Sequence, residues 1–186
     1  RFTVEQQGVS AIAIHDGLAR VEQAVLEGAE TKLRILGTAE LKENGALTLR
    51  ADGDLDAAVL SAFTAGVRAE GPARFRMTAF GTARAPQLAG FVEWADGRAT
   101  MANPNLVAER VNARVNFTGE RLDIARFEAE LNGGTLRGSG FASVAAGALK
   151  DADLKLDAKG IYAEYPRGVK TVSNADLRIT ESGYGL

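Results

Sequence analysis

The chain has 186 residues, a formal net charge of −2 at pH 7 and an isoelectric point near 5.6. This weakly acidic balance argues against a nucleic-acid-binding protein, which usually carries a basic stripe, and the lack of cysteine excludes disulfides, thiolate metal sites and cysteine nucleophiles. Hydrophobic residues make up 46% of the chain, enough for a core, but aromatic residues make up only 6%. No apolar run approaches the ~18 residues of a membrane helix, and no signal peptide is recognisable.

Segments with strict alternation of apolar and polar residues run along the whole chain. In 32–42, Leu33, Ile35 and Leu41 fall on one side and charged residues on the other. Because successive side chains of a strand point to opposite faces, each such segment predicts a strand with one apolar face. Turns of glycine, asparagine and aspartate separate the segments, including one at 95–97, which is typical of an all-β meander. In chain order the predicted strands are 11–14, 18–26, 32–42, 46–52, 74–84, 88–94, 98–102, 111–117, 122–124, 127–131, 136–144, 152–158 and 175–180.

One segment departs from this alternation. Apolar residues recur every four positions between Asp54, which can cap a first helical turn, and Gly66, which can end the last. These apolar residues are Leu55, Val59 and Phe63. The pattern predicts one short amphipathic helix near 54–65 that closes one end of the apolar surface.

The chain offers no complete catalytic or metal-binding motif. His15 is the only histidine and lies in a turn-like segment, where a solvated side chain is expected. The aspartates of 52–56 resemble the start of a calcium loop, but Ala57 and Phe63 stand where such a loop needs glycine and an acidic ligand. Residues 138–140 resemble a phosphate-binding loop, but a strand follows them instead of a helix, so we expect these glycines to mark a bend or a shallow place. We therefore predict a protein that is not an enzyme and that uses no metal or cofactor.

The predicted strands share one apolar surface, and what covers it decides the function. A closed β-sandwich or barrel satisfies the alternation as well as an open trough does, but the aliphatic, repetitive composition with few large side chains favours the trough. The residues expected to line it, in contact with a lipid or a protein strand, are Ile12, Ile14, Leu33, Ile35, Leu47, Leu49, Phe75, Met77, Val92, Trp94, Val111, Val115, Phe117, Leu122, Ile124, Leu154, Leu156, Leu177 and Ile179. The residues expected to face water are Arg34, Arg50, Arg76, Arg114, Asp123, Lys155 and Asp176.

A weak internal repeat relates 18–55 to 122–158, at an offset of about a hundred residues. Chance similarity in a chain rich in alanine and glycine is the alternative explanation. If real, the repeat predicts an elongated array whose units stack edge to edge. Since the alternating pattern also starts and stops abruptly at the two ends, we interpret 1–186 as a single fragment of a longer array.

Several sequence motifs, in their order, resemble a known family. They are Gly81-x-Ala83-x-Ala85-Pro86-x-Leu88-x-Gly90, Asp96-Gly97-Arg98-Ala99, Phe117-Thr118-Gly119-Glu120-Arg121-Leu122-x-Ile124, Leu131-Asn132-Gly133-Gly134-Thr135-Leu136-x-Gly138-x-Gly140, Tyr165-Pro166-Arg167-Gly168 and Asn174-Ala175-Asp176-Leu177-Arg178-Ile179-Thr180. Each motif is degenerate alone, and their order is what carries the resemblance. From about Leu18 onward the chain resembles the TamB family, the inner-membrane subunits of the translocation and assembly module, and more broadly the AsmA-like bridge proteins.

This resemblance implies a fold and a function. The fold would be a long antiparallel sheet curled into an open apolar trough, a β-taco, in the periplasmic portion of an inner-membrane-anchored protein of a Gram-negative bacterium. The trough would carry phospholipid acyl chains between the membranes. The main alternative is a scaffold that shelters strands of outer-membrane β-barrel proteins during assembly and secretion, and a closed β-sandwich spacer is a second. The implied partners are phospholipid acyl chains, nascent outer-membrane proteins, and the barrel protein TamA through a region outside this fragment. No catalytic residues are implied.

Overall fold

The computed structural model describes residues 4–6, 11–28, 31–62, 66–145, 148–164, 168 and 170–182. Over these residues the chain is almost entirely β-structure. The elements are β1 (Val4–Gln6), β2 (Ala11–His15), β3 (Leu18–Gly28), β4 (Thr31–Glu40), β5 (Ala46–Asp56), the 3-10 helix η1 (Ala57–Ala62), β6 (Val67–Glu70), β7 (Pro72–Thr82), β8 (Pro86–Met101), β9 (Leu106–Gly119), β10 (Arg121–Leu131), β11 (Gly134–Ala145), β12 (Ala148–Glu164) and β13 (Lys170–Ser182).

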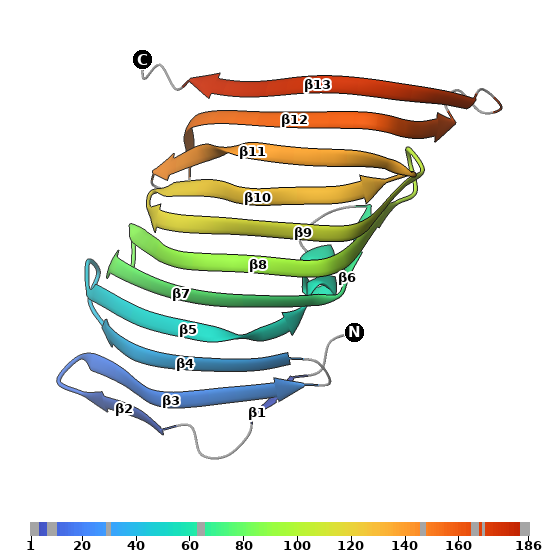
Figure 1. Ribbon diagram of the computed structural model, residues 1–186. Helices are drawn as coiled ribbons and strands as arrows, with labels where there is room; N and C mark the ends of the chain where they lie inside the picture. The colour runs from blue at the N-terminus through green and yellow to red at the C-terminus, as the bar shows by residue number, and fades with distance from the viewer. Residues whose placement is uncertain are drawn as a thin grey trace.

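These strands form one 13-stranded sheet with antiparallel neighbours (Figure 1). The main path runs in the order β1-β3-β4-β5-β7-β8-β9-β10-β11-β12-β13, while β2 pairs with β3 and β6 with β8. The two ends of this path do not pair with each other, so the sheet is open. The predicted all-β class and open, curled trough are thereby confirmed, and the alternative of a closed β-sandwich is wrong.

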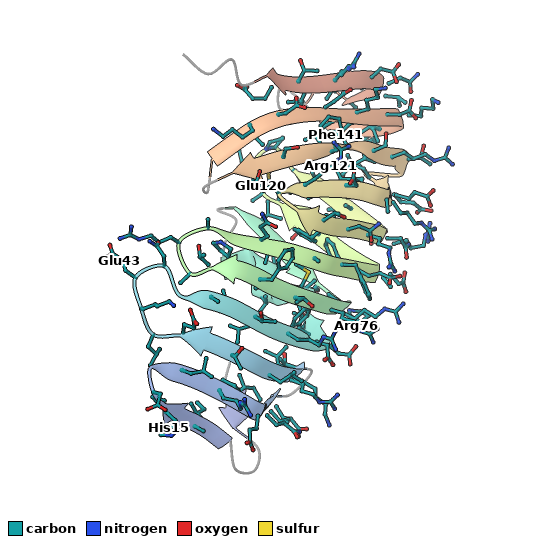
Figure 2. The ribbon with its side chains drawn as sticks, turned by 90° about the vertical axis from the view of Figure 1, so that its left-hand side faces the viewer. His15, Glu43, Arg76, Glu120, Arg121 and Phe141 are labelled. Carbon is teal, nitrogen blue, oxygen red and sulfur yellow. The ribbon has the colours of Figure 1, made fainter. Side chains whose placement is uncertain are left out.

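The strand register aligns residues of like character in rows across the sheet. Directly paired residues of antiparallel strands lie on the same face. One row contains Leu26, Leu33, Gly53, Phe75, Val92, Val115, Ile124, Gly140, Leu154 and Ile179. A row on the opposite face contains Arg34, Asp52, Arg76, Phe91, Asn116, Asp123, Phe141, Asp153 and Thr180. We call these two surfaces the apolar face and the charged face; Figure 2 shows charged side chains, Arg76 among them, projecting on one side of the ribbon.

The register confirms the predicted division of side chains between the two faces. Ile35, Leu49 and Met77 share the apolar face because Gly37 pairs with Leu49, and Ala51 pairs with both Ile35 and Met77. The remaining members of the predicted set follow through the same pairings on β9, β10, β12 and β13. The residues predicted to face water all lie in rows of the charged face.

Two predicted breaks between strands are wrong, because the chain continues as one strand through each. β8 runs through the predicted turn at 95–97, and β10 joins the two short strands predicted on either side of 125–126. In both places the register shifts, which is the signature of a β-bulge. A bulge interrupts the two-residue alternation for one residue, and from sequence this interruption resembles a turn.

The predicted helix begins later than expected. Asp54 is still part of β5, where it pairs with Arg74, so it does not cap a helix. Asp56 takes that role, because its Oδ1 accepts a hydrogen bond of 2.6 Å from the backbone N–H of Ala58. Residue 63, the last apolar position of the predicted pattern, lies outside the described residues. Within the described residues, the helical part of this segment is the 3-10 helix η1.

Buried side chains are few and small. Ala57, Ala69 and Ala73 form a cluster where η1 meets β6 and β7, and Leu55 and Trp94 pack against it. The indole Nε1 of Trp94 donates a hydrogen bond of 3.3 Å to the carbonyl of Glu70. As predicted, the helical segment covers one end of the apolar face, while the described part of the sheet has no second layer over the rest.

Candidate functional site

The candidate site is the apolar face itself, which carries no charge over most of its length. From β3 to β12, the paired positions on this face within the described residues are apolar or glycine, apart from Thr31 at the start of β4. The first charged residue in these rows is Glu181, near the end of β13, opposite Ala152. An uncharged surface of this extent favours contact with hydrocarbon over contact with polar ligands.

All the residues predicted to line the trough lie on this face, but they differ in exposure. Most are half-buried. Val111 is only 2% exposed, so it contributes packing and little contact surface. Ile14 and Leu177, near the two edges of the sheet, are 67% and 56% exposed. The accessible part of the predicted site therefore extends from one edge of the sheet to the other.

Glycines place shallow points within the apolar face. A Cβ on Gly90 or Gly140 would lie 2.0 Å from a backbone carbonyl oxygen, that of Arg76 or Asp153. Both glycines also have positive φ angles, 137° and 134°, which other residues rarely adopt. The expectation that the glycines of 138–140 mark a bend or a shallow place is consistent with this geometry.

Sequence reasoning missed Phe127 as a member of this face. The bulge in β10 moves Phe127 into the row of Trp94 and Ala113. A Cβ on Gly138 would lie 2.9 Å from the Phe127 ring and 3.2 Å from Leu156, so these two side chains occupy the space above the glycine. The available signal was that the alternation resumes after a slip of one residue at 125–126.

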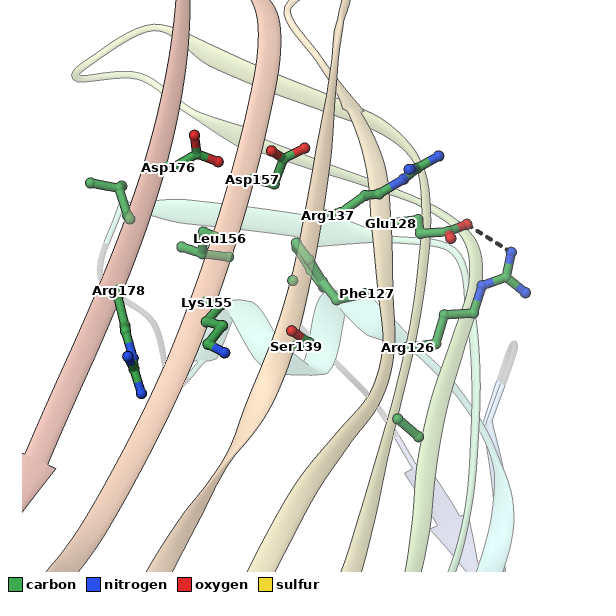
Figure 3. Close-up of a pocket in the computed structure, with 13 residues that line it drawn as sticks. Arg126, Phe127, Glu128, Arg137, Ser139, Lys155, Leu156, Asp157, Asp176 and Arg178 are labelled. Atoms are coloured by element: carbon green, nitrogen blue, oxygen red, sulfur yellow. Dashed lines mark hydrogen bonds and ion pairs between the residues drawn. The ribbon is translucent and has the colours of Figure 1, made fainter.

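A hollow of about 610 Å³ lies among β10, β11, β12 and β13 (Figure 3). Phe127, Leu156 and Leu177 contribute to its lining, together with charged side chains from the same strands. The hollow lies at the β13 end of the described sheet.

The charged face satisfies many of its own charges. Glu93 accepts hydrogen bonds from Arg74 at 2.9 Å and Arg114 at 3.1 Å, which ties three neighbouring strands together. The hydrogen bond from Arg74 is the main cause that lowers the pKa of Glu93. The Arg121 guanidinium stacks over Phe141 at 3.7 Å from the ring centre, and both are visible in Figure 2. This face therefore carries a network of exposed ion pairs, together with arginines stacked on aromatic rings.

The residues weighed for catalysis or metal binding lie on two strands, His15 at the end of β2 and the aspartates of 52–56 in β5. His15 lies in the β2–β3 turn with 90% of its side chain exposed, 3.4 Å from Asp16. Among the described residues, no group of three or more histidine, cysteine or acidic side chains is arranged to hold a metal ion. No helix in the described part of the chain is long and apolar enough to cross a membrane.

Fold and site together define an open all-β sheet with one uncharged apolar face and one charged face. No protein-family model, curated protein or solved structure gives a significant match to this chain.

Proposed function

We propose that the apolar face is a groove that carries phospholipid acyl chains as part of a periplasmic bridge between two membranes. The observation behind this proposal is the absence of charge from the paired positions of the apolar face between β3 and β12. The sequence resemblance to the TamB family supports the same function.

The energetics of acyl-chain burial suit such a groove. Each buried methylene contributes about 0.8 kcal/mol, so roughly ten buried methylenes contribute about 8 kcal/mol toward extraction of a lipid from a membrane. Rows of leucine, isoleucine and valine give similar contacts at successive strands, so no single position binds much more tightly than the next. A chain can then move along the rows, perpendicular to the strands.

The groove should not select among head groups. No arginine or lysine occupies a paired position on the apolar face over the described residues, so a phosphate group has no cation to bind there. We therefore expect phospholipids of different head groups to be carried, with contacts restricted to their acyl chains.

Site-specific photo-crosslinking in the full-length protein in cells tests this function. A photoreactive residue at Ile35, Val115 or Leu156, on the apolar face, is expected to capture phospholipid. The matched control is the preceding residue in each case, since Arg34, Arg114 and Lys155 share the same strands but lie on the charged face. Equal lipid capture on both faces would refute the proposal. Capture of protein alone at the apolar positions would favour the alternative, a scaffold for outer-membrane protein strands.

A further inference from the structure

The two margins of the apolar face, where the strands end, differ in how they are covered. At the margin where β5 ends and β7 begins, Ala57 of η1 packs with Ala73, and Leu55 and Trp94 pack against this cluster. Ala73 is therefore only 6% exposed, and Val111, farther along the same margin, is also buried. We call this side the closed margin; in Figure 1 it lies on the right, beside η1.

The opposite side, which we call the open margin, is formed by the β4–β5, β7–β8 and β9–β10 turns and by the end of β11 (Figure 1). Among the described side chains from β4 to β11, the most exposed large apolar ones are Leu41 at 58% and Val144 at 36%, and both lie at this margin. Lys42 and Arg84 form exposed ion pairs in the β4–β5 and β7–β8 turns. The open margin therefore places accessible apolar surface directly beside water.

The accessible width of the apolar face between the two margins matches the length of one acyl chain. One leaflet of a bilayer contributes about 15 Å, which is half of the ~30 Å hydrocarbon core. On β8, Leu88 lies next to the open margin, and Val92 is the last residue of the apolar face before Trp94. The residues from the first to the second of these span about 13 Å of strand. An acyl chain that lies along β8 from Leu88 therefore ends near Val92, just before the residues that η1 covers.

A phospholipid head group carries charge and stays in water, because burial of an unpaired charge is costly. We propose that a phospholipid in the groove has one orientation, in which its head group projects over the open margin and its acyl chains point toward η1. A lipid that moves along the rows then keeps its head group at the same margin from strand to strand. This inference rests on the proposed function and adds to it the orientation of the carried lipid.

The two turns at the ends of β8 give a matched test, because the chain has no native cysteine. Ala85→Cys places a thiol at the open margin and Ala102→Cys places one at the closed margin, and both alanines are exposed. Each variant is incubated with vesicles that contain a phospholipid with a maleimide on its head group. Each rate is divided by the rate with soluble N-ethylmaleimide, which corrects for thiol reactivity. We expect Ala85→Cys to react about tenfold faster, which corresponds to an orientational preference of about 1.4 kcal/mol.

The outcomes of this test separate the orientation from the proposed function. Equal corrected rates, or a faster reaction of Ala102→Cys, would overturn the orientation and leave the groove itself in place. Reaction of neither variant with the vesicles would also overturn it. The proposed function is judged separately by phospholipid capture at Val115, which does not depend on the position of the head group.

Phospholipids with a photoreactive group at two different depths test the direction of the acyl chains independently. A group close to the glycerol should label the row of Leu49 and Leu88, beside the open margin. A group at the end of the acyl chain should label the row of Phe75 and Val92, nearer to η1. Mass spectrometry of the labelled peptides identifies the positions. Identical labelling by both lipids, or labelling in the reverse order, would contradict the proposed orientation.

Discussion

Replacement of Asn132 by alanine should destabilise the sheet, because this side chain joins three separate segments. Its Oδ1 accepts a hydrogen bond of 2.7 Å from the backbone N–H of Val107 in β9. Its Nδ2 donates to the carbonyl of Asn105 at 3.1 Å and to that of Tyr162 in β12 at 2.8 Å. Asn132 itself lies in the β10–β11 turn with a φ of 44°.

The expected loss follows from these contacts. Each hydrogen bond contributes about 0.5–1.5 kcal/mol net, and alanine in a left-handed conformation costs about 1 kcal/mol more than asparagine or glycine. Together the change should lower the free energy of unfolding by about 3 kcal/mol, a large part of the 5–15 kcal/mol typical of a domain. In urea denaturation the midpoint should fall while the slope m stays unchanged.

Two matched variants separate the contributions. Asn132→Gly removes the same hydrogen bonds but tolerates the positive φ, so it should be about 1 kcal/mol more stable than Asn132→Ala. Asn44→Ala changes an exposed asparagine in the β4–β5 turn and should shift stability by less than about 0.5 kcal/mol. A loss below about 1 kcal/mol for Asn132→Ala, or equal losses for both alanine variants, would refute the reasoning.

Three further predictions concern the two faces of the sheet. Val115→Asp should keep the circular dichroism of the folded sheet, because water reaches this half-buried position. It should abolish phospholipid capture by a photoreactive residue at Ile35, because an acyl chain avoids the charge. Loss of the folded spectrum would count against an open groove. Gly140→Ala should lower stability by about 2 kcal/mol or more in thermal unfolding, since its Cβ would lie 2.0 Å from the carbonyl oxygen of Asp153; an unchanged midpoint would contradict this. The hydrogen bond from Arg178 lowers the pKa of Asp153, so the stability from this pair should be present above about pH 4 and be lost as the pH falls below it. Arg178→Gln should reduce that acid-dependent loss, and an unchanged pH profile would exclude the pair as its source.

The division of side chains between the two faces could be predicted from sequence because it follows a local rule. Leu33 and Ile35, or Val111 and Val115, repeat at even spacing, and strand geometry converts that spacing directly into a shared face. The Asn-Gly and Asn-Gly-Gly signals likewise placed the turns after β4 and β10. The prediction that the sheet is open rested on the scarcity of large apolar side chains and also on the family resemblance. The internal repeat of about a hundred residues stays a prediction.

The bulges could not be predicted, because they depend on contacts distant in sequence. The bulge at Asp96 is supported by a hydrogen bond of 3.3 Å from its N–H to the side chain of Asn112 on β9. The bulge at Gly160 is supported by a hydrogen bond of 2.7 Å from its N–H to Asn174 on β13. In the sequence, each asparagine looks like an ordinary polar residue of a strand. No neighbouring residue indicates that its side chain stabilises a bulge in the adjacent strand.

The sheet carries its ion pairs on one face and its uncovered apolar surface on the other. The buried side chains among the described residues are mostly alanines, three of which cluster at η1, so no large closed core holds this part of the sheet together. Instead, backbone pairing between successive strands carries much of the stability, and groups such as Arg74, Glu93 and Arg114 link neighbouring strands on the charged face. Single exposed ion pairs contribute about 0–1 kcal/mol each, but they lie in rows that also oppose slippage of the register, because a shift by one residue would place them on the apolar side. The apolar face is thereby left uncovered without unfolding the sheet, which is the condition that a groove for acyl chains requires.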